Sequence, residues 1–303
     1  MKLLVRLLLV LFALVLPSVA GAAPDGVTKR GGIVDADPAL WVIRDADTTI
    51  YLFGTMHMLK PGLSWFDEGI ARAFAASDEL MLEILPLDDP AALAPLLMEL
   101  AQDPGGRTMA KRLSADDHAA YSARLTAMGA SPADLDRFEP WFITMNLAVA
   151  DYMRRGLSYQ SGVERVLEGA AKSAGKSITA LETAEEQMRM LDSVPDEEQV
   201  AALMSFVRDG DRLLDQMDEL IGHWAAGEAE AAGRLMNDGM ADTPETARII
   251  LTERNRRWVD QLVERLDRPG TVFVAVGTGH LIGTDNVRAL LEARGLTAEP
   301  VPY

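Results

Sequence analysis

The same four-residue pattern follows a β-rich run at two distant places in this chain: Gly54-Thr55-Met56-His57 and Gly277-Thr278-Gly279-His280. The run before the second copy, Thr271 to Val276, is fully apolar and rich in β-branched residues, which predicts a strand in the centre of a sheet. In open α/β sheets, ligands bind at the carboxyl ends of the strands. We therefore predict that both histidines project over one edge of a single sheet.

Other β-rich runs extend this sheet. Leu40 to Ile43 and Thr48 to Phe53 are separated by Arg44-Asp45-Ala46-Asp47, a composition typical of a hairpin turn. Further strands are predicted at 80–85, 177–181 and 297–301, the first buried and the last at an edge. These runs predict an α/β (α+β) fold with a mixed central sheet, built around the two strand-Gly-Thr-x-His units.

A large helical insertion separates the strands. From about residue 89 to 173, apolar residues recur at helical spacing and almost no window alternates. Ser114, followed by acidic residues, predicts a helix N-cap, and Gly129 predicts the left-handed residue that closes the same helix. Further helices are predicted at 65–77, 184–191, 196–226, 228–237, 244–266 and 287–293. We expect one domain, 39–303, to hold all these elements.

The amino terminus predicts export. A basic start precedes an apolar run at 7–16, and small residues follow, as in secretory signal peptides. We predict a signal peptide at 1–22, a flexible lead-in at 23–38, and a periplasmic or secreted location. The run is shorter than the about 20 apolar residues of a membrane-spanning helix. No stable membrane insertion is therefore expected after cleavage; a retained anchor is the alternative.

The chain has no cysteine and a formal net charge of -17. Disulfides and thiolate metal ligands are therefore excluded, as is a lipid anchor on a cysteine, and stability must come from the hydrophobic core. A net negative field repels nucleic acid and anionic membrane surfaces at long range. We expect neither as a partner.

The paired motifs predict a metal site. In each copy the glycine lets the backbone turn sharply off the strand, and the threonine can bond local backbone groups. Two imidazoles brought together in this way, His57 and His280, could share a divalent ion, because neutral histidine is a favoured ligand of zinc and other transition metals. Mixed nitrogen and oxygen ligands suit zinc, manganese or cobalt. The alternative is two structural turns whose histidines bond neighbouring backbone.

Two glutamates are candidates to complete the site. Glu83 interrupts an apolar strand, where a carboxylate is costly to bury unless a metal, a cation or hydrogen bonds compensate it. Glu182 stands at the end of the strand predicted at 177–181, but it is equally suited to the first turn of the next helix. We predict Glu83 as a metal ligand and both glutamates as catalytic candidates.

A basic run, Glu253-Arg254-Asn255-Arg256-Arg257-Trp258, precedes the strongest strand. Most of its arginines are typical of a solvated helix face. Arg254 and Asn255 are the exceptions that we assign to the site. Of the other histidines, His118 and His223 lie in helical patterns and are expected at the surface, while three tryptophans are expected in the core: Trp141, Trp224 and Trp258.

Together these residues resemble the TraB/GumN family, which is related to the Tiki metalloproteases. The segments that carry the resemblance are Tyr51 to His57, Leu82-Glu83, Leu181-Glu182-Thr183 with Gln187, Glu253-Arg254-Asn255, and Phe273 to Leu281. They span about 40–301. The family's Gly-x-x-His pair maps onto Gly54 to His57 and Gly277 to His280.

The resemblance implies metal-dependent hydrolysis, known as proteolysis in the Tiki branch. It also implies a fold related to the Tiki proteases, the erythromycin-esterase-like enzymes and the haem-binding lipoproteins of the ChaN-like type. Because these relatives differ in activity, the fold does not decide the function.

Two functions follow as hypotheses. In the first, a periplasmic metal-dependent hydrolase, acting on a peptide or protein, uses His57 and His280 with a glutamate to hold an ion and its water. The second glutamate removes the proton, and Arg254 or Asn255 stabilises the oxyanion. His-Glu-x-x-His is absent, so the helix-borne zinc protease mechanism does not apply.

The second hypothesis is a non-catalytic protein that binds a metal, haem or a peptide. Haem needs an accessible axial ligand, and His223 and Tyr159 are the candidates.

Overall fold

The computed structural model describes residues 33–85 and 90–303. The predicted signal peptide and most of the lead-in lie outside the described residues. Among the helices within the described ranges, none combines the length and the apolar character that crossing a membrane requires.

In the described part of the chain, one mixed sheet of six strands has the order β6-β5-β7-β3-β2-β8. Its strands are β2 (Leu40–Arg44), β3 (Thr48–Thr55), β5 (Glu79–Ile84), β6 (Ser177–Glu182), β7 (Gly270–Gly277) and β8 (Glu299–Pro300). The strands β6, β5, β7 and β3 are parallel, while β2 is antiparallel to both β3 and β8. The predicted fold class is confirmed, and the apolar strand β7 lies in the interior of the sheet as expected.

The register of β3 and β7 places the two motifs side by side. Thr55 pairs with Gly277 across the two strands. The Thr278 hydroxyl donates a hydrogen bond to the Thr55 carbonyl oxygen at 2.9 Å. A Cβ on Gly54 would lie 3.0 Å from that hydroxyl oxygen, so glycine is needed for the motifs to approach this closely. Strand β3 accordingly continues two residues beyond its predicted end.

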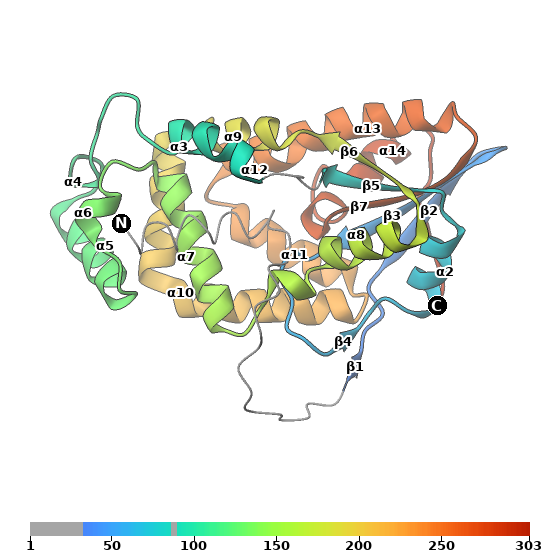
Figure 1. Ribbon diagram of the computed structural model, residues 1–303, viewed down its shortest axis with the longest axis horizontal. Helices are drawn as coiled ribbons and strands as arrows, with labels where there is room; N and C mark the ends of the chain where they lie inside the picture. Colours follow the sequence, from blue (N-terminus) through green and yellow to red (C-terminus); the bar gives the residue numbers. More distant parts are fainter. Residues whose placement is uncertain (1–32, 86–89) are drawn as a thin grey trace.

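Helices α2 (Glu68–Ala76), α8 (Val163–Ala174) and α13 (Glu253–Leu266) contact the sheet, and α14 (Val287–Glu292) packs on α13. The core between them is built on the apolar strands, with Leu52, Phe53 and Phe273 fully buried. Two short strands, β1 (Val34–Asp35) and β4 (Leu63–Ser64), form a separate parallel pair. Figure 1 shows the sheet gathered at one end of the molecule.

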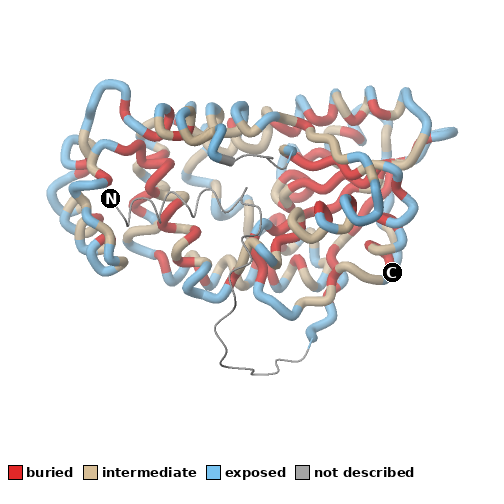
Figure 2. The backbone as a smooth tube through the Cα atoms, viewed as in Figure 1, coloured by how far each residue is buried: buried red, intermediate tan, exposed pale blue. Residues whose placement is uncertain are grey.

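The helical insertion forms the other end (Figure 1). It contains η2 (Pro90–Leu93), α3 (Ala94–Leu100), α4 (Met109–Arg112), α5 (Ala115–Ala127), α6 (Pro132–Leu135), α7 (Pro140–Arg154) and η3 (Tyr159–Ser161). A second core centres on Tyr121, Trp141 and Phe142, and Figure 2 shows buried backbone at both ends. The predicted cap at Ser114 accepts a hydrogen bond from the backbone of the first turn, and Gly129 has a φ of 77°, as predicted.

Helices α9 (Ala184–Asp192), α10 (Asp196–Ala225) and α11 (Ala229–Met240) follow strand β6. Helix α10 joins the two cores, because Leu203 packs in the helical core and Trp224 in the sheet core. Its backbone leaves helical geometry at Asp209, between these two residues. The two ends of the molecule therefore share one kinked helix.

The single helix predicted at 244–266 is wrong in one respect. The structure has α12 (Pro244–Ala247), a π-helical turn η4 (Arg248–Thr252) and then α13. A π turn inserts one residue and rotates the side chains that follow it. Arg254 and Asn255 lie in the first turn of α13, which follows this π turn, and are 5% and 0% exposed. The two buried polar residues of the basic run, Arg254 and Asn255, therefore follow an irregular turn of the helix.

Candidate active site

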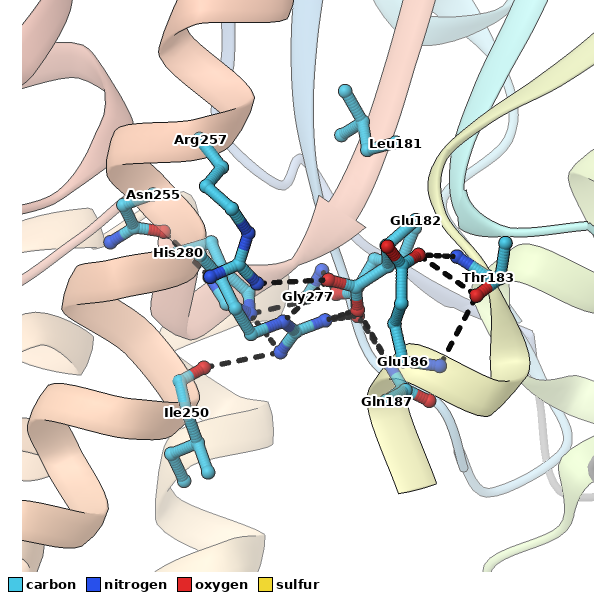
Figure 3. A network of polar contacts seen from close by, with 12 residues as sticks. Leu181, Glu182, Thr183, Glu186, Gln187, Ile250, Asn255, Arg257, Gly277 and His280 are labelled. Atoms are coloured by element: carbon cyan, nitrogen blue, oxygen red, sulfur yellow. Dashed lines mark hydrogen bonds and ion pairs between the residues drawn. The ribbon is translucent and has the colours of Figure 1, made fainter. Parts of the chain in front are cut away.

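The carboxyl ends of four parallel strands carry most of the predicted site residues. Glu83 lies on β5 and Glu182 ends β6, while His57 and His280 follow β3 and β7. Helix α13 brings Arg254 over the same edge, where it contacts both glutamates and His280. Figure 3 shows Glu182, His280 and Asn255 arranged around this network.

The guanidinium of Arg254 is at the centre of the network. An arginine has five N–H donors. Nε donates to Glu182 Oε2 at 3.1 Å, and Nη2 donates to Glu182 Oε1 and Glu83 Oε2, each at 2.5 Å. Nη1 donates to the Ile250 carbonyl oxygen at 3.1 Å and lies 2.9 Å from His280 Nε2. Every donor of Arg254 therefore has a partner within the protein, which leaves none for a substrate oxyanion.

Glu83 is buried but fully compensated. Burial alone would raise the pKa of its carboxyl, but the Arg254 guanidinium, the charge of His57 and the Gly277 N–H outweigh it and hold the pKa well below its usual value. The Gly277 N–H donates to Oε1 at 2.6 Å. Gln187 on α9 donates through Nε2 to both Glu83 and Glu182, each at 3.2 Å. Glu83 is therefore an ionised, fixed carboxylate at neutral pH.

The ring of His280 is neutral, and its tautomer follows from its neighbours. The Asp285 carbonyl oxygen can only accept, so it faces the Asn255 amide nitrogen, at 2.9 Å. Asn255 Oδ1 must then accept from His280 Nδ1–H, at 2.7 Å, which leaves Nε2 as the acceptor for Arg254. Burial, with Arg254 beside the ring, lowers the pKa of His280 to about 3. Both ring nitrogens are thus engaged, and the ring also packs 4.3 Å from Trp258.

His57 has a different environment. Its side chain is 56% exposed, and its Nδ1 lies 2.6 Å from Oε1 of Glu164, in the first turn of α8. The Thr55 hydroxyl donates to the same carboxylate oxygen. The negative charge of Glu164 raises the pKa of His57 to about 9. The pair leaves Nε2 of His57 without a protein hydrogen bond in the described residues.

Close approach of α8 makes this pair possible. The backbone N–H of Val163 donates to the Met56 carbonyl oxygen at 3.0 Å, so the helix begins directly against the first motif. Gly162 lies at the contact, and a Cβ at this position would overlap the His57 carbonyl oxygen. Glycine at 162 is therefore required by space, since its φ of -63° is open to any residue.

Gly277 has no side chain on the face that borders Glu83 and His57. The point where a Cβ would stand on Gly277 is 3.0 Å from Glu83 Oε1 and 4.0 Å from His57 Nε2. The absence of a side chain at 277 keeps this point open. Glu83 Oε1 and His57 Nε2 therefore border the same side of the Gly277 backbone.

The predicted metal ligands do not converge on an open point. His280 uses both nitrogens and Glu83 Oε2 faces Arg254, so only His57 Nε2 and Glu83 Oε1 remain, whereas catalytic zinc sites use three protein ligands. An ion of charge +2 at about 4 Å from a guanidinium is repelled by about 8 kcal/mol at an effective dielectric constant of about 20. Within the described ranges, no three acidic, histidine or cysteine side chains group as a metal site.

The donor set in this arrangement therefore does not fit a divalent metal, and the zinc, manganese or cobalt ion stays a prediction.

The other sequence predictions have definite positions. Glu182 does not lie in the first turn of the next helix, because Thr183 is the N-cap of α9 and forms a capping box with Glu186. His223 is half-buried, and its Nδ1 lies 2.7 Å from Glu228. Tyr159, the second candidate haem ligand, packs against the sheet core. The three tryptophans are buried as predicted.

Glu164 is the site residue that the sequence analysis missed. It looks like an ordinary acidic residue in the first turn of a helix, a position where acids are favoured by the helix dipole. The usable signal was the preceding Gly162, which marks a close backbone contact. Sequence alone does not say that this contact is with the first motif.

Comparison with known proteins places the chain in a family. Residues 39–300 match the sequence model of the TraB/PrgY/gumN family. An uncharacterized protein, YbaP, of Escherichia coli (strain K12) is 25% identical over 269 residues, which cover 84% of this chain and 92% of that protein. An uncharacterized protein of Treponema pallidum (strain Nichols) is 22% identical over 294 residues, covering 91% of this chain and 85% of that protein.

No solved structure matches the chain significantly. The relation to the Tiki, esterase and haem-binding folds therefore stays a prediction.

Proposed function

The chain belongs to the TraB/PrgY/gumN family, and on that premise we propose that it hydrolyses an amide or ester carbonyl, with peptides as the first substrate class to test. The observation that carries this proposal is the His57–Glu164 pair, in which Nδ1 is fixed by a carboxylate at 2.6 Å and Nε2 is left free beside Glu83. A histidine oriented in this way is a recurrent general base. The signal peptide predicted at 1–22 favours action in the periplasm or outside the cell.

The proposed reaction takes place above Gly277. A water molecule donates one hydrogen bond to Glu83 Oε1 and the other to His57 Nε2, and its oxygen attacks the substrate carbonyl carbon. In the neutral form of His57, which predominates only above a pH of about 9, the proton passes to Nε2 and then to the leaving nitrogen or oxygen as the carbon–heteroatom bond breaks. Glu164 stabilises the imidazolium that forms in between, as a charged partner of Nδ1–H.

Arg254, Asn255 and His280 act on this reaction indirectly. The saturated guanidinium holds Glu83 ionised and in place, and Asn255 and His280 hold the guanidinium. This differs from the oxyanion role predicted from the sequence, because a donor whose hydrogens are all engaged cannot bind a developing charge without releasing a buried carboxylate.

A divalent metal would supply a bound hydroxide and polarise the carbonyl. No step here depends on it, because the donors in this arrangement do not fit one. The resemblance to metalloproteases nevertheless makes metal dependence the competing form of the hydrolase, and the same experiment separates the two.

The test uses the mature chain, 23–303, on pooled fluorogenic peptides and on an activated ester, before and after dialysis against a chelator. The proposal predicts turnover that survives dialysis and falls at least about 100-fold in His57→Ala, the lower range for loss of a general base. His118→Ala, at a histidine in the helical end, is the matched control and should retain full activity.

Equal turnover in His57→Ala and the unmodified chain would remove the proposal. Turnover that disappears on dialysis and returns with zinc, manganese or cobalt would support the metal-dependent form instead. Binding of a peptide without turnover would support the non-catalytic alternative.

A further inference from the structure

We propose that the guanidinium of Arg254 is the resident cation of this site and occupies the position that a divalent metal would otherwise take. Three acceptors converge on its terminal nitrogens. Glu83 Oε2 and Glu182 Oε1 each lie 2.5 Å from Nη2, and His280 Nε2 lies 2.9 Å from Nη1. Two carboxylates and one imidazole are the ligand chemistry of many catalytic metal sites, here closed around an organic cation.

The guanidinium of Arg254 is also fixed by contacts outside these three acceptor atoms. Its Nε donates to Glu182, and Nη1 donates to the Ile250 carbonyl oxygen, which belongs to the π-helical turn η4. The guanidinium carbon lies 4.5 Å from the centroid of the Trp258 ring, in cation–π contact. The side chain of Arg254 is only 6% exposed. The guanidinium is therefore part of the folded core of the site and not a surface arginine that happens to reach a carboxylate.

The three acceptor side chains are themselves hydrogen-bonded by outer residues, as metal ligands usually are. Asn255 fixes the tautomer of His280, and Gln187 bonds both carboxylates. Outer partners of this kind orient metal ligands and set their basicity. His57 lies outside the set, because its carboxylate partner is Glu164 on another helix. The site thus has one histidine committed to the cation and one facing the open space.

One consequence separates this proposal from the hydrolase proposal. Removing the guanidinium while keeping its acceptors leaves an imidazole nitrogen and two buried carboxylates around a void. Without compensation the two carboxylates repel each other, so a divalent cation should bind there. The unmodified chain, in contrast, should bind no such ion. The readout is metal content, which does not depend on whether any substrate is turned over.

The experiment compares the mature chain with Arg254→Ala, Arg254→Lys and the matched control Arg257→Ala. Arg257 is a neighbouring exposed arginine, 3.9 Å from Glu182, whose removal changes the net charge equally without opening the site. Each protein is dialysed against a chelator, incubated separately with zinc, manganese or cobalt, and desalted. Metal content and the thermal unfolding midpoint are then measured.

We expect one ion per chain and a metal-dependent rise in the unfolding midpoint for Arg254→Ala only. Adding His280→Gln to Arg254→Ala should weaken metal binding at least about ten-fold, because it removes one ligand. Metal bound by the unmodified chain and lost in Glu83→Gln would overturn the proposal. So would an Arg254→Ala protein that binds no more metal than Arg257→Ala, or that stays unfolded with each of the three metals.

Discussion

The two Gly-Thr-x-His copies have nearly the same sequence and lie at the ends of adjacent parallel strands, yet their histidines have opposite environments. The His57 side chain is 56% exposed and is paired with a carboxylate, whereas that of His280 is 5% exposed and bonded by an amide and a guanidinium. The motif therefore determines where the backbone turns. The helix that packs against it determines what the imidazole can do.

The two helices differ in what they bring to the sheet edge. Helix α8 begins against the first motif and contributes an anion, Glu164, which raises the pKa of His57. Helix α13 follows a π turn and brings a cation, Arg254, to the second motif. We infer that the first copy acts on the substrate and that the second positions the charges around it.

The two histidine variants, His280→Ala and His57→Ala, should differ most in the free energy of unfolding. His280→Ala should lower the free energy of unfolding by about 2–4 kcal/mol, because it leaves a cavity and removes a partner from Arg254 and Asn255, both buried. His57→Ala should cost less than about 1 kcal/mol, since its ion pair is largely exposed. Urea denaturation of both variants measures the difference, and equal losses would contradict the division of roles.

A smaller effect is expected where α8 meets the first motif. Gly162→Ala should lower the free energy of unfolding by about 1–3 kcal/mol, because a Cβ there overlaps the His57 carbonyl oxygen. Gly169→Ala is the control on the same helix. It has no heavy atom near its Cβ position and should stabilise the protein by about 0.5–1 kcal/mol. If the two variants behave alike under thermal unfolding, the close contact is not required.

The carboxylate partner of His57 should affect the rate. Glu164→Gln should lower kcat/KM by about 10–100-fold, as is usual when an orienting partner of a reactive histidine is removed. It should also move the acid limb of the pH–rate profile, where activity is lost as His57 becomes protonated, from about 9 toward the ordinary histidine value of 6.5. Glu185→Gln, at an exposed glutamate of α9, should change neither. An unshifted limb in Glu164→Gln would separate His57 from catalysis.

The smallest effect concerns stability against pH. The pKa of His57 is raised from 6.5 to about 9, so its pairing contributes fully below pH 6.5 and is lost as the pH rises through about 9. The pKa of Glu164 is lowered below 4.5 despite burial, so its contribution is lost on the acid side. The unfolding midpoint should therefore differ between the unmodified chain and Glu164→Gln at pH 6 but not at pH 10. A difference that persists at pH 10 would assign Glu164 another role.

Much of the sheet edge was predictable because it depends on local pattern. The apolar run at 271–276 predicted an interior strand, and the shared motif predicted two neighbouring turns. Glu83 required a compensating partner because it interrupts an apolar strand, and Arg254 and Asn255 were correctly separated from the exposed arginines beside them.

The identity of each partner was not predictable. The contact between Glu164 and His57 depends on where a helix more than a hundred residues further along the chain begins. The spacing of residues in the sequence does not predict this contact. The saturation of Arg254 depends on a π turn that periodicity does not reveal, so its oxyanion role was assigned before its donors could be counted. The metal prediction arose in the same way, from two histidines whose other contacts were unknown.

The most direct test of the division between the motifs is the imidazole nitrogen NMR spectrum of the mature chain, in which only four histidines contribute. The account predicts that His57 is protonated at pH 7 and titrates near pH 9, while His280 stays neutral with hydrogen on Nδ1 down to about pH 3. Adding zinc should shift neither ring. Simultaneous perturbation of both rings by one equivalent of metal would contradict it and restore a shared ion.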